Sequence, residues 1–269
     1  MRVLLLWLVA LALPTVGMAE RARLEYSVHA DHFHVLDGAF RLDLRDGRYL
    51  LEGDSHTTGM LGFFFPYRVS VWSAGMLADD AVAPGSFGNR GSSSREYRQV
   101  EMVYDNGGPR VMTLLPGPED DEREPVPEDM HPGTIDPLSA TVLVARRVTE
   151  TGECPAMPER IFDGRRLFTL SLDPLEAPLP DDLELPGEVV GPVVACALDA
   201  EQLAGHWTGE RGRWSAGPFR RREESEAVPT VVWFGRLDEQ VPMVPLAVER
   251  DGGWRILMQL TGFEDAGVN

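Results

Sequence analysis

The sequence is poor in cysteine and has no long apolar run after its N-terminal segment. Its two cysteines, Cys154 and Cys196, do not form the Cys-x-x-Cys spacing of redox motifs and zinc sites. Neither has a histidine or arginine beside it that would lower the pKa of a reactive thiol. A transmembrane helix needs about 20 consecutive apolar residues. The absence of such a run predicts no stable membrane insertion for the chain after residue 19.

Signatures of catalysis and metal binding are also missing. The chain has no His-Glu-x-x-His, no Gly-x-Ser-x-Gly, no phosphate-binding glycine-rich loop and no dinucleotide fingerprint. His29, Asp31, His32 and His34 have the chemistry of metal ligands. On a strand, however, His32 and His34 point away from the other two, so the four cannot converge without a bend. We therefore expect no metal, no cofactor and no catalytic residues, and we rank an enzyme below a binding protein.

Basic residues are scarce beside acidic ones, 25 against 43, which gives a formal net charge of −18. Loss of residues 1–19 would remove only Arg2 from this balance and leave a charge of −19. Such a surface repels nucleic acid and anionic lipid headgroups, so we expect neither as a partner. A hydrophobic content of 43% is that of a globular protein with a core.

The N-terminus has the three parts of a secretory signal. Arg2 precedes the apolar run 3–13, Pro14 follows it, and Gly17-Met18-Ala19 is a small-residue cleavage site. We expect residues 1–19 to be removed and residues 20–269 to form a single β-rich domain, free in solution in the periplasm. An oxidising compartment favours a disulfide between Cys154 and Cys196.

Asx-Gly dipeptides recur between runs of apolar and β-branched residues, which indicates hairpins. A two-residue turn at Asp46-Gly47 pairs Leu44 with Tyr49 and Leu42 with Leu51 on one face. Asp163-Gly164 is predicted to turn a further hairpin through a longer loop. We expect strands over residues 24–30 and near 62–76, 95–104, 109–115, 158–172, 188–200 and 229–237, with the same dipeptides at 37–38, 106–107 and 251–252.

One helix is expected among the strands. Asp136 is a suitable N-cap, Pro137 fits the first helical position, and an apolar face continues to Arg146-Arg147. Before it, residues 116–133 contain five prolines and seven acidic residues, a composition typical of a solvated loop. This loop lacks the alternating acidic positions of a calcium loop.

The segment from Gly59 to Trp72 has more aromatic residues than one sheet face can bury. Read as a strand, it places Phe63, Phe65 and Tyr67 on one face and Phe64 and Trp72 on the other. The segment is then either a strand covered on both sides or the lip of a groove for an apolar ligand or partner.

Several blocks together resemble the proteobacterial family called domain of unknown function 3108. They are residues 123–127, 133–140, 162–166 and 203–207 with Cys154 and Cys196, and also 57–62 and 242–246. The resemblance implies a periplasmic location and a mainly β fold. It supplies no catalytic residues, because the family is uncharacterised.

We therefore predict a mainly β fold: a curved antiparallel β-meander, like a half-barrel, with one helix packed on it. The first functional hypothesis is a non-catalytic periplasmic protein that binds a lipid or acyl chain in envelope biogenesis. Its candidate binding residues are Phe63, Phe64, Phe65, Tyr67 and Trp72. The alternative is a protein-interaction or assembly factor of the cell envelope, which would have an exposed apolar patch instead of a cavity.

Overall fold

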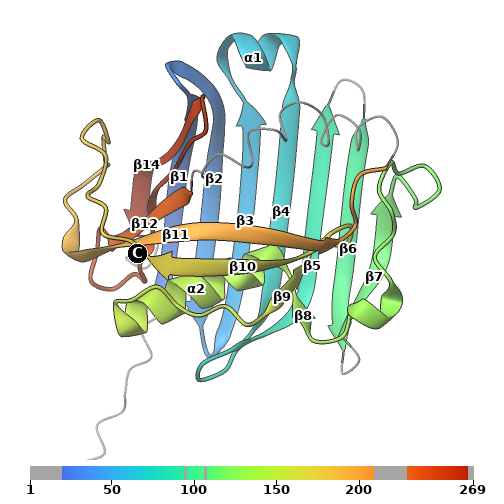
Figure 1. Cartoon of the computed structure of the whole chain (residues 1–269). Helices are drawn as coiled ribbons and strands as arrows, with labels where there is room; N and C mark the ends of the chain where they lie inside the picture. The colour runs from blue at the N-terminus through green and yellow to red at the C-terminus, as the bar shows by residue number, and fades with distance from the viewer. Residues whose placement is uncertain (1–19, 94–95, 106–107, 209–228, 266–269) are drawn as a thin grey trace, which may run out of the picture.

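The computed structural model describes residues 20–93, 96–105, 108–208 and 229–265, so the predicted signal segment lies outside the described residues. Strands dominate this part of the chain (Figure 1). They are β1 (Glu20–Ala30), β2 (Phe33–Arg45), β3 (Arg48–Thr57), β4 (Tyr67–Leu77), β5 (Val82–Ser93), β6 (Tyr97–Asp105), β7 (Gly108–Leu115), β8 (Thr134–Ile135), β9 (Arg160–Phe162), β10 (Leu167–Pro174), β11 (Val190–Ala204), β12 (Thr230–Arg236), β13 (Val244–Asp251) and β14 (Arg255–Asp265). The helices are α1 (Gly59–Phe64), α2 (Pro137–Thr151) and the short 3-10 helix η1 (Glu128–Met130).

All 14 strands belong to one sheet, in the order β7-β6-β5-β4-β3-β2-β1-β14-β13-β12-β11-β10-β9-β8. Neighbours are antiparallel except for the short parallel pair β8–β9. Because β1 pairs with β14, the sheet has two arms that extend from this central pair. The arms curve toward each other into a nearly closed, barrel-like sheet, which confirms the predicted mainly β meander (Figure 1).

The hairpin at Asp46-Gly47 has the predicted register. Leu44 lies opposite Tyr49 and Leu42 opposite Leu51, and all four side chains are buried. Both turn residues have positive φ, 52° for Asp46 and 68° for Gly47, which is the conformation that this dipeptide tolerates. Asp37-Gly38, in contrast, lies inside β2 with partners on both sides, so its hairpin signal is wrong.

Helix α2 lies between the two arms of the sheet. Leu143, Val144 and Val148 pack against β9 to β12 in one hydrophobic cluster, and Val142 packs against β2 and β3 in another. Asp136 caps the helix, because its carboxylate accepts from the amides of Leu138 and Ser139. The helix ends at Thr151, four residues later than predicted, and the C-cap Gly152 has a left-handed φ of 69° that stops it.

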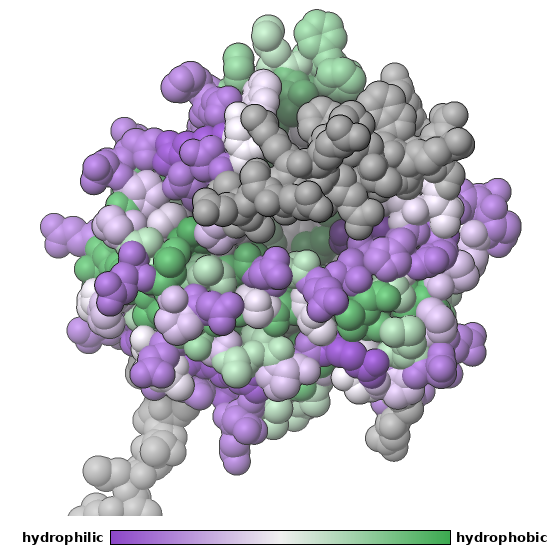
Figure 2. Space-filling model, viewed as in Figure 1, coloured by the Kyte–Doolittle hydropathy of each residue, from purple (hydrophilic) through white to green (hydrophobic). Residues whose placement is uncertain are grey.

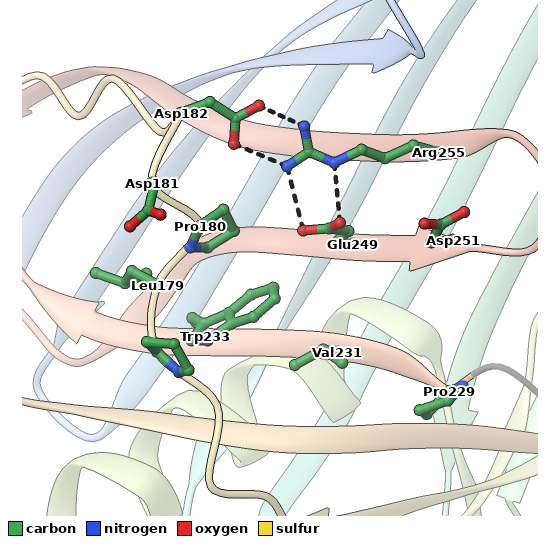
Figure 3. Close-up of a pocket in the computed structure, with 11 residues that line it drawn as sticks. Leu179, Pro180, Asp181, Asp182, Pro229, Val231, Trp233, Glu249, Asp251 and Arg255 are labelled. Atoms are coloured by element: carbon green, nitrogen blue, oxygen red, sulfur yellow. Dashed lines mark hydrogen bonds and ion pairs between the residues drawn. The ribbon is translucent and has the colours of Figure 1, made fainter.

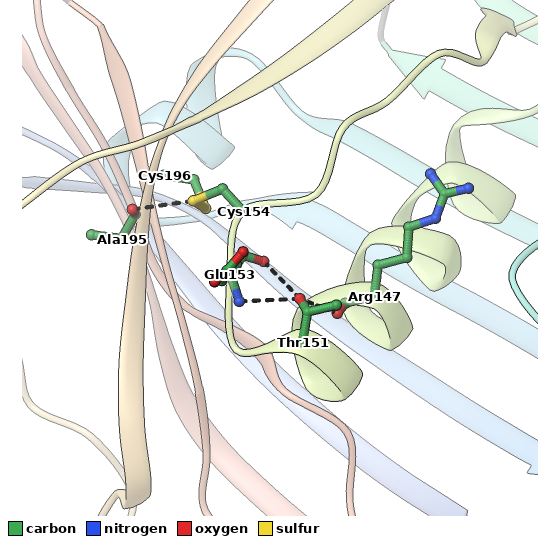
Figure 4. The surroundings of a disulfide bond; sticks show 6 residues. All are labelled: Arg147, Thr151, Glu153, Cys154, Ala195 and Cys196. Carbon is green, nitrogen blue, oxygen red and sulfur yellow. Dashed lines mark hydrogen bonds between the residues drawn. A yellow bond between two sulfur atoms is a disulfide. The ribbon is translucent and has the colours of Figure 1, made fainter.

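The predicted disulfide is confirmed. Cys154 and Cys196 are joined with a Cα–Cα distance of 5.8 Å, and the bond links the segment after α2 to β11 (Figure 4). Cys196 is fully buried in the cluster that surrounds α2. The bond therefore holds the C-terminal end of this helix against the β8–β12 arm.

Side chains join the two arms where strand pairing ends. The side chain of Asp121 is only 5% exposed and forms ion pairs with Arg98 of β6 and with Arg165, which precedes β10. The Arg123 guanidinium stacks on the Trp207 ring at 3.7 Å and also donates to the carbonyl of Gly205. Most of the loop 116–133 is exposed, as its composition predicts, but Asp121 and Arg123 contact both arms of the sheet.

Two strands, β9 and β10, replace the one expected over residues 158–172. Asp163-Gly164 forms the turn between them, with Asp163 accepting from the amides of Arg165 and Arg166. Gly164 has a φ of 88°, and a Cβ there would lie 2.3 Å from Val100. This turn needs glycine for its backbone conformation and for its contact with β6.

Candidate functional site

The aromatic segment 59–65 forms a short helix and a loop, not the predicted strand. Thr58 has extended backbone, and Gly59 then turns with a φ of 57° into α1. A Cβ on Gly62 would lie 2.5 Å from the Thr57 carbonyl, so this glycine lets the helix pack on the end of β3. The strand prediction near 62–76 is wrong before Tyr67, where Gly59 and Gly62 permit a compact helical turn, and is confirmed from Tyr67, where β4 begins.

Apolar side chains of α1 and the residues after it are exposed to solvent at one end of the sheet. We call residues 59–67 the α1 tip. Met60 is 75% exposed, Phe63 81%, Phe64 65% and Phe65 63%. No residue of this segment is charged. Figure 2 shows the resulting group of hydrophobic residues above the more polar flank of the molecule.

Hydrogen bonds to the end of β3 and to β2 fix the backbone of the α1 tip. The Thr57 hydroxyl donates to the carbonyl of Phe65 and accepts from the amide of Tyr67, both at 3.0 Å. The amide of Thr58 donates to the carbonyl of Val35 at 3.1 Å. The aromatic side chains are therefore presented by a braced backbone.

The structure brings together four of the five residues proposed as a ligand-binding set. Phe63 and Phe64 are in edge contact, with ring centroids 5.1 Å apart, and Phe65 and Tyr67 follow them. Trp72 is separate. It lies further along β4 on the outer face, since its neighbour Ser73 points inward, and the Arg90 guanidinium lies over its ring.

Two exposed aromatic residues at the same end of the sheet were missed by the sequence analysis. Phe33 begins β2, and Trp254 occupies the turn between β13 and β14. The amide of Asp31 donates to the carbonyl of Arg255, which brings these two turns together. The sequence signal for their exposure was an aromatic residue beside a tight turn, because side chains at strand ends have no cross-strand neighbour to cover them.

The concave side of the sheet is occupied by α2 and its packing partners. Seven residues of this helix are buried, and residues of β5 and β6 also contact β9 to β11 directly. Among the described residues, side chains of the protein itself therefore occupy the part of the concave side where α2 lies.

A closed polar cluster lies at the start of α2. The Asp136 carboxylate, fully buried, accepts from the hydroxyls of Ser73 and Ser139, and Ser139 also contacts the hydroxyl of Tyr49. Burial raises the pKa of Asp136, while its four hydrogen bonds oppose that shift. This cluster attaches the helix to β3 and β4, which gives Asp136 and Pro137 a structural role.

His29 and His34 were expected on opposite faces, but they lie side by side, because β1 and β2 pair across the first turn. Their rings stack with centroids 5.0 Å apart, and His34 Nε2 is hydrogen-bonded to the Asp37 carboxylate. Within the residues that the structure describes, no three histidine, cysteine or acidic side chains are grouped to hold a metal ion. No helix in those ranges combines the length and apolar content needed to cross a bilayer.

Comparisons with known proteins place the chain in a family without assigning it an activity. No curated protein matches the chain. Among solved structures, it is similar to a beta-barrel-like protein of domain of unknown function DUF1849 from Brucella abortus, with 12% identity, a TM-score of 0.44, and coverage of 92% of this chain and 98% of the other. The model of the family described as "Protein of unknown function (DUF3108)" matches residues 25–177, more than half of the sequence. The chain therefore belongs to the DUF3108 family, as the resemblance of its sequence blocks predicted.

Proposed function

We propose that this protein is a non-catalytic periplasmic binding protein that docks its α1 tip into an apolar groove of an envelope protein. The observation that carries the proposal is the exposure of Phe63, Phe64 and Phe65 on a braced, uncharged segment. Large exposed apolar patches are rare on monomeric proteins and mark interaction sites. Exposing three phenylalanines has no benefit for folding, which supports a role in binding.

The shape of the tip favours a partner over a small ligand. A pocket binds a free acyl chain by surrounding it, whereas the α1 tip protrudes beyond the ends of β3 and β4 (Figure 1). A protruding aromatic group buries its surface by entering a groove on another molecule. Aromatic residues also dominate the energetic centres of protein interfaces.

Charge favours a protein over a lipid surface. Loops that insert into membranes are attracted by basic residues to anionic headgroups. The strand ends that support the tip carry Glu52, Asp54 and only one arginine, Arg68. The net charge of −18 adds long-range repulsion from such a surface.

Photocrosslinking in cells tests the proposal. A benzophenone amino acid at position 63 should give one discrete protein adduct. The same group at Met112, which is apolar and 57% exposed on β7, should not. The Phe64→Ser/Phe65→Ser change should remove the adduct. It should leave the urea unfolding midpoint unchanged, because these side chains are exposed.

The outcomes are distinct. A lipid adduct at position 63, or flotation of the purified protein with vesicles, would show that the α1 tip binds a lipid or membrane and would refute the protein partner. Equal crosslinking from positions 63 and 112, or an adduct that survives the serine substitutions, would refute specific docking through the α1 tip.

A further inference from the structure

A proline-rich segment crosses the outer face of the sheet. It links β10 to β11, and we call its residues 175–189 the strap. Figure 3 shows residues 179–182 of the strap passing across β12, β13 and β14 instead of running along them. Leu179 and Leu183 of the strap pack with Trp233 of β12 in one hydrophobic cluster. The strap therefore covers part of the outer face with its own side chains.

The sheet beneath the strap has an apolar outer surface. Val232 and Phe234 belong to the cluster around α2, so Trp233 between them points to the outer face. Trp233, Ala247 and Leu257 form one cluster there and are only 4%, 0% and 6% exposed. The outward face of an antiparallel sheet is usually polar where it meets water. We call these three residues the outer patch, and the strap is what shields it from solvent.

The contact between the strap and the outer patch is typical of the recognition of proline-rich peptides. The indole nitrogen of Trp233 donates to the carbonyl of Ala177 at 3.1 Å, and Ala177 directly precedes Pro178. Pro178 and Pro180 flank Leu179, and their rings favour an extended polyproline-type backbone. Such a backbone leaves its carbonyls free and loses little entropy when an aromatic surface binds it. The strap is thus held as a separate proline-containing peptide would be.

The strap can leave the outer patch without opening the sheet or leaving a charge unpaired. Residues 175–189 belong to no strand or helix of the described chain. Asp182 forms an ion pair with Arg255, and the two side chains are 58% and 30% exposed. Such exposed pairs contribute about 0–1 kcal/mol. Arg255 also binds Glu249 at 2.9 Å, so its charge keeps a partner when Asp182 moves away (Figure 3).

An open hollow gives access to the outer patch from one side of the strap. Its volume is about 640 Å³, and its lining includes Leu179 and Pro180 of the strap with Val231 and Trp233 of β12 (Figure 3). Trp233 lies at the boundary between this hollow and the strap. A second segment can therefore approach the indole ring before the strap has left.

We propose that the outer patch is a binding site for an extended, proline-containing segment of a partner protein, and that the strap occupies this site in its absence. In the complex, a carbonyl that precedes a proline accepts from Trp233, and two apolar side chains take the places of Leu179 and Leu183. Because the strap is tethered at both ends, its effective concentration at the patch is on the order of 1 mM. A free segment therefore binds weakly until the strap is loosened.

Fluorescence anisotropy with a labelled peptide of residues 174–186 tests the site. In Leu179→Ser/Leu183→Ser the strap loses its apolar anchors while the outer patch is unchanged. This variant should bind the peptide at least tenfold more tightly than the parent protein does. Glu176→Ser/Glu184→Ser changes two exposed residues of the same strap and should leave the peptide affinity within twofold of the parent value.

Two further changes test the chemistry of recognition. Pro178→Ala/Pro180→Ala in the peptide removes its preference for the extended backbone. This peptide should bind the Leu179→Ser/Leu183→Ser protein at least fivefold more weakly than the original peptide does. Adding Trp233→Phe to the same protein keeps an aromatic ring but removes the indole donor, and it should weaken binding of the original peptide by a similar factor.

Photolabelling of the parent protein gives a measurement that does not depend on the serine variant. A peptide with benzophenone at the position of Leu179 should label β12 to β14, and an excess of unlabelled peptide should suppress this labelling. Labelling elsewhere, or none, would overturn the proposal. Equal binding to the parent and the Leu179→Ser/Leu183→Ser protein, equal binding of the proline and alanine peptides, or an unchanged affinity in Trp233→Phe would also overturn it.

Discussion

Removing the Asp136 carboxylate should destabilise the fold by more than the loss of a helix cap alone, because the same carboxylate also accepts from two buried hydroxyls. In Asp136→Ala, α2 loses an N-cap, which costs about 1 kcal/mol. The hydroxyls of Ser73 and Ser139 also lose their buried acceptor, at about 1–3 kcal/mol each. We expect the free energy of unfolding to fall by about 3–7 kcal/mol.

Urea unfolding with the disulfide intact is the appropriate assay, because the midpoint shift at constant slope reports stability alone. Asp136→Asn keeps an oxygen for the backbone amides and should cost much less than alanine. Asp79→Ala, in an exposed turn, should stay within about 0.5 kcal/mol of the parent protein. A loss below about 1 kcal/mol for Asp136→Ala would contradict the structural role of the cluster.

The same residue gives a pH dependence with a defined sign. Burial raises the folded-state pKa of Asp136 above its ordinary value of 3.8, so the folded protein binds this proton more tightly than the unfolded chain. As the pH falls through the raised pKa toward the ordinary value, the parent protein should gain stability relative to Asp136→Asn. An advantage that shrinks over that window would show that the hydrogen bonds outweigh burial.

Two other changes probe the frame around the helix. Cys154→Ser/Cys196→Ser opens a loop with a sequence separation of 42 and should lower the free energy of unfolding by about 4 kcal/mol; an unchanged urea midpoint would refute this. Gly164→Ala places a methyl group against Val100 in a left-handed conformation and should cost about 1–3 kcal/mol. Adding Val100→Ala should relieve the steric clash and leave the backbone strain in place. Equal calorimetric midpoints of Gly164→Ala and the parent protein would exclude both effects.

Features with local causes could be predicted from the sequence. Asp46-Gly47 specifies its own turn and so sets the register of β2 and β3. Asp136 and Pro137 determine the start of α2 through their own backbone preferences. The cysteine pair followed from the number of cysteines and the expected compartment, and needed no knowledge of the fold.

Features that depend on distant residues could not be predicted. The closure of the barrel uses Asp121 with Arg165 and Arg123 with Trp207, and no local pattern joins these positions. The path of residues 59–65 depends on the hydroxyl of Thr57, which bridges both ends of the loop. Composition alone identified the aromatic excess there but not its exposure.

The pairing of β1 with β14 has a consequence for how the chain can fold. Leu24 lies opposite Phe263, so the centre of the sheet joins residues from opposite ends of the described chain. Such pairing has a high loop-closure cost and slows folding. A chain emerging in sequence order can complete its arms early, yet it cannot join them until the last strand is available. The centre of the sheet therefore stays open until β14 has been synthesised.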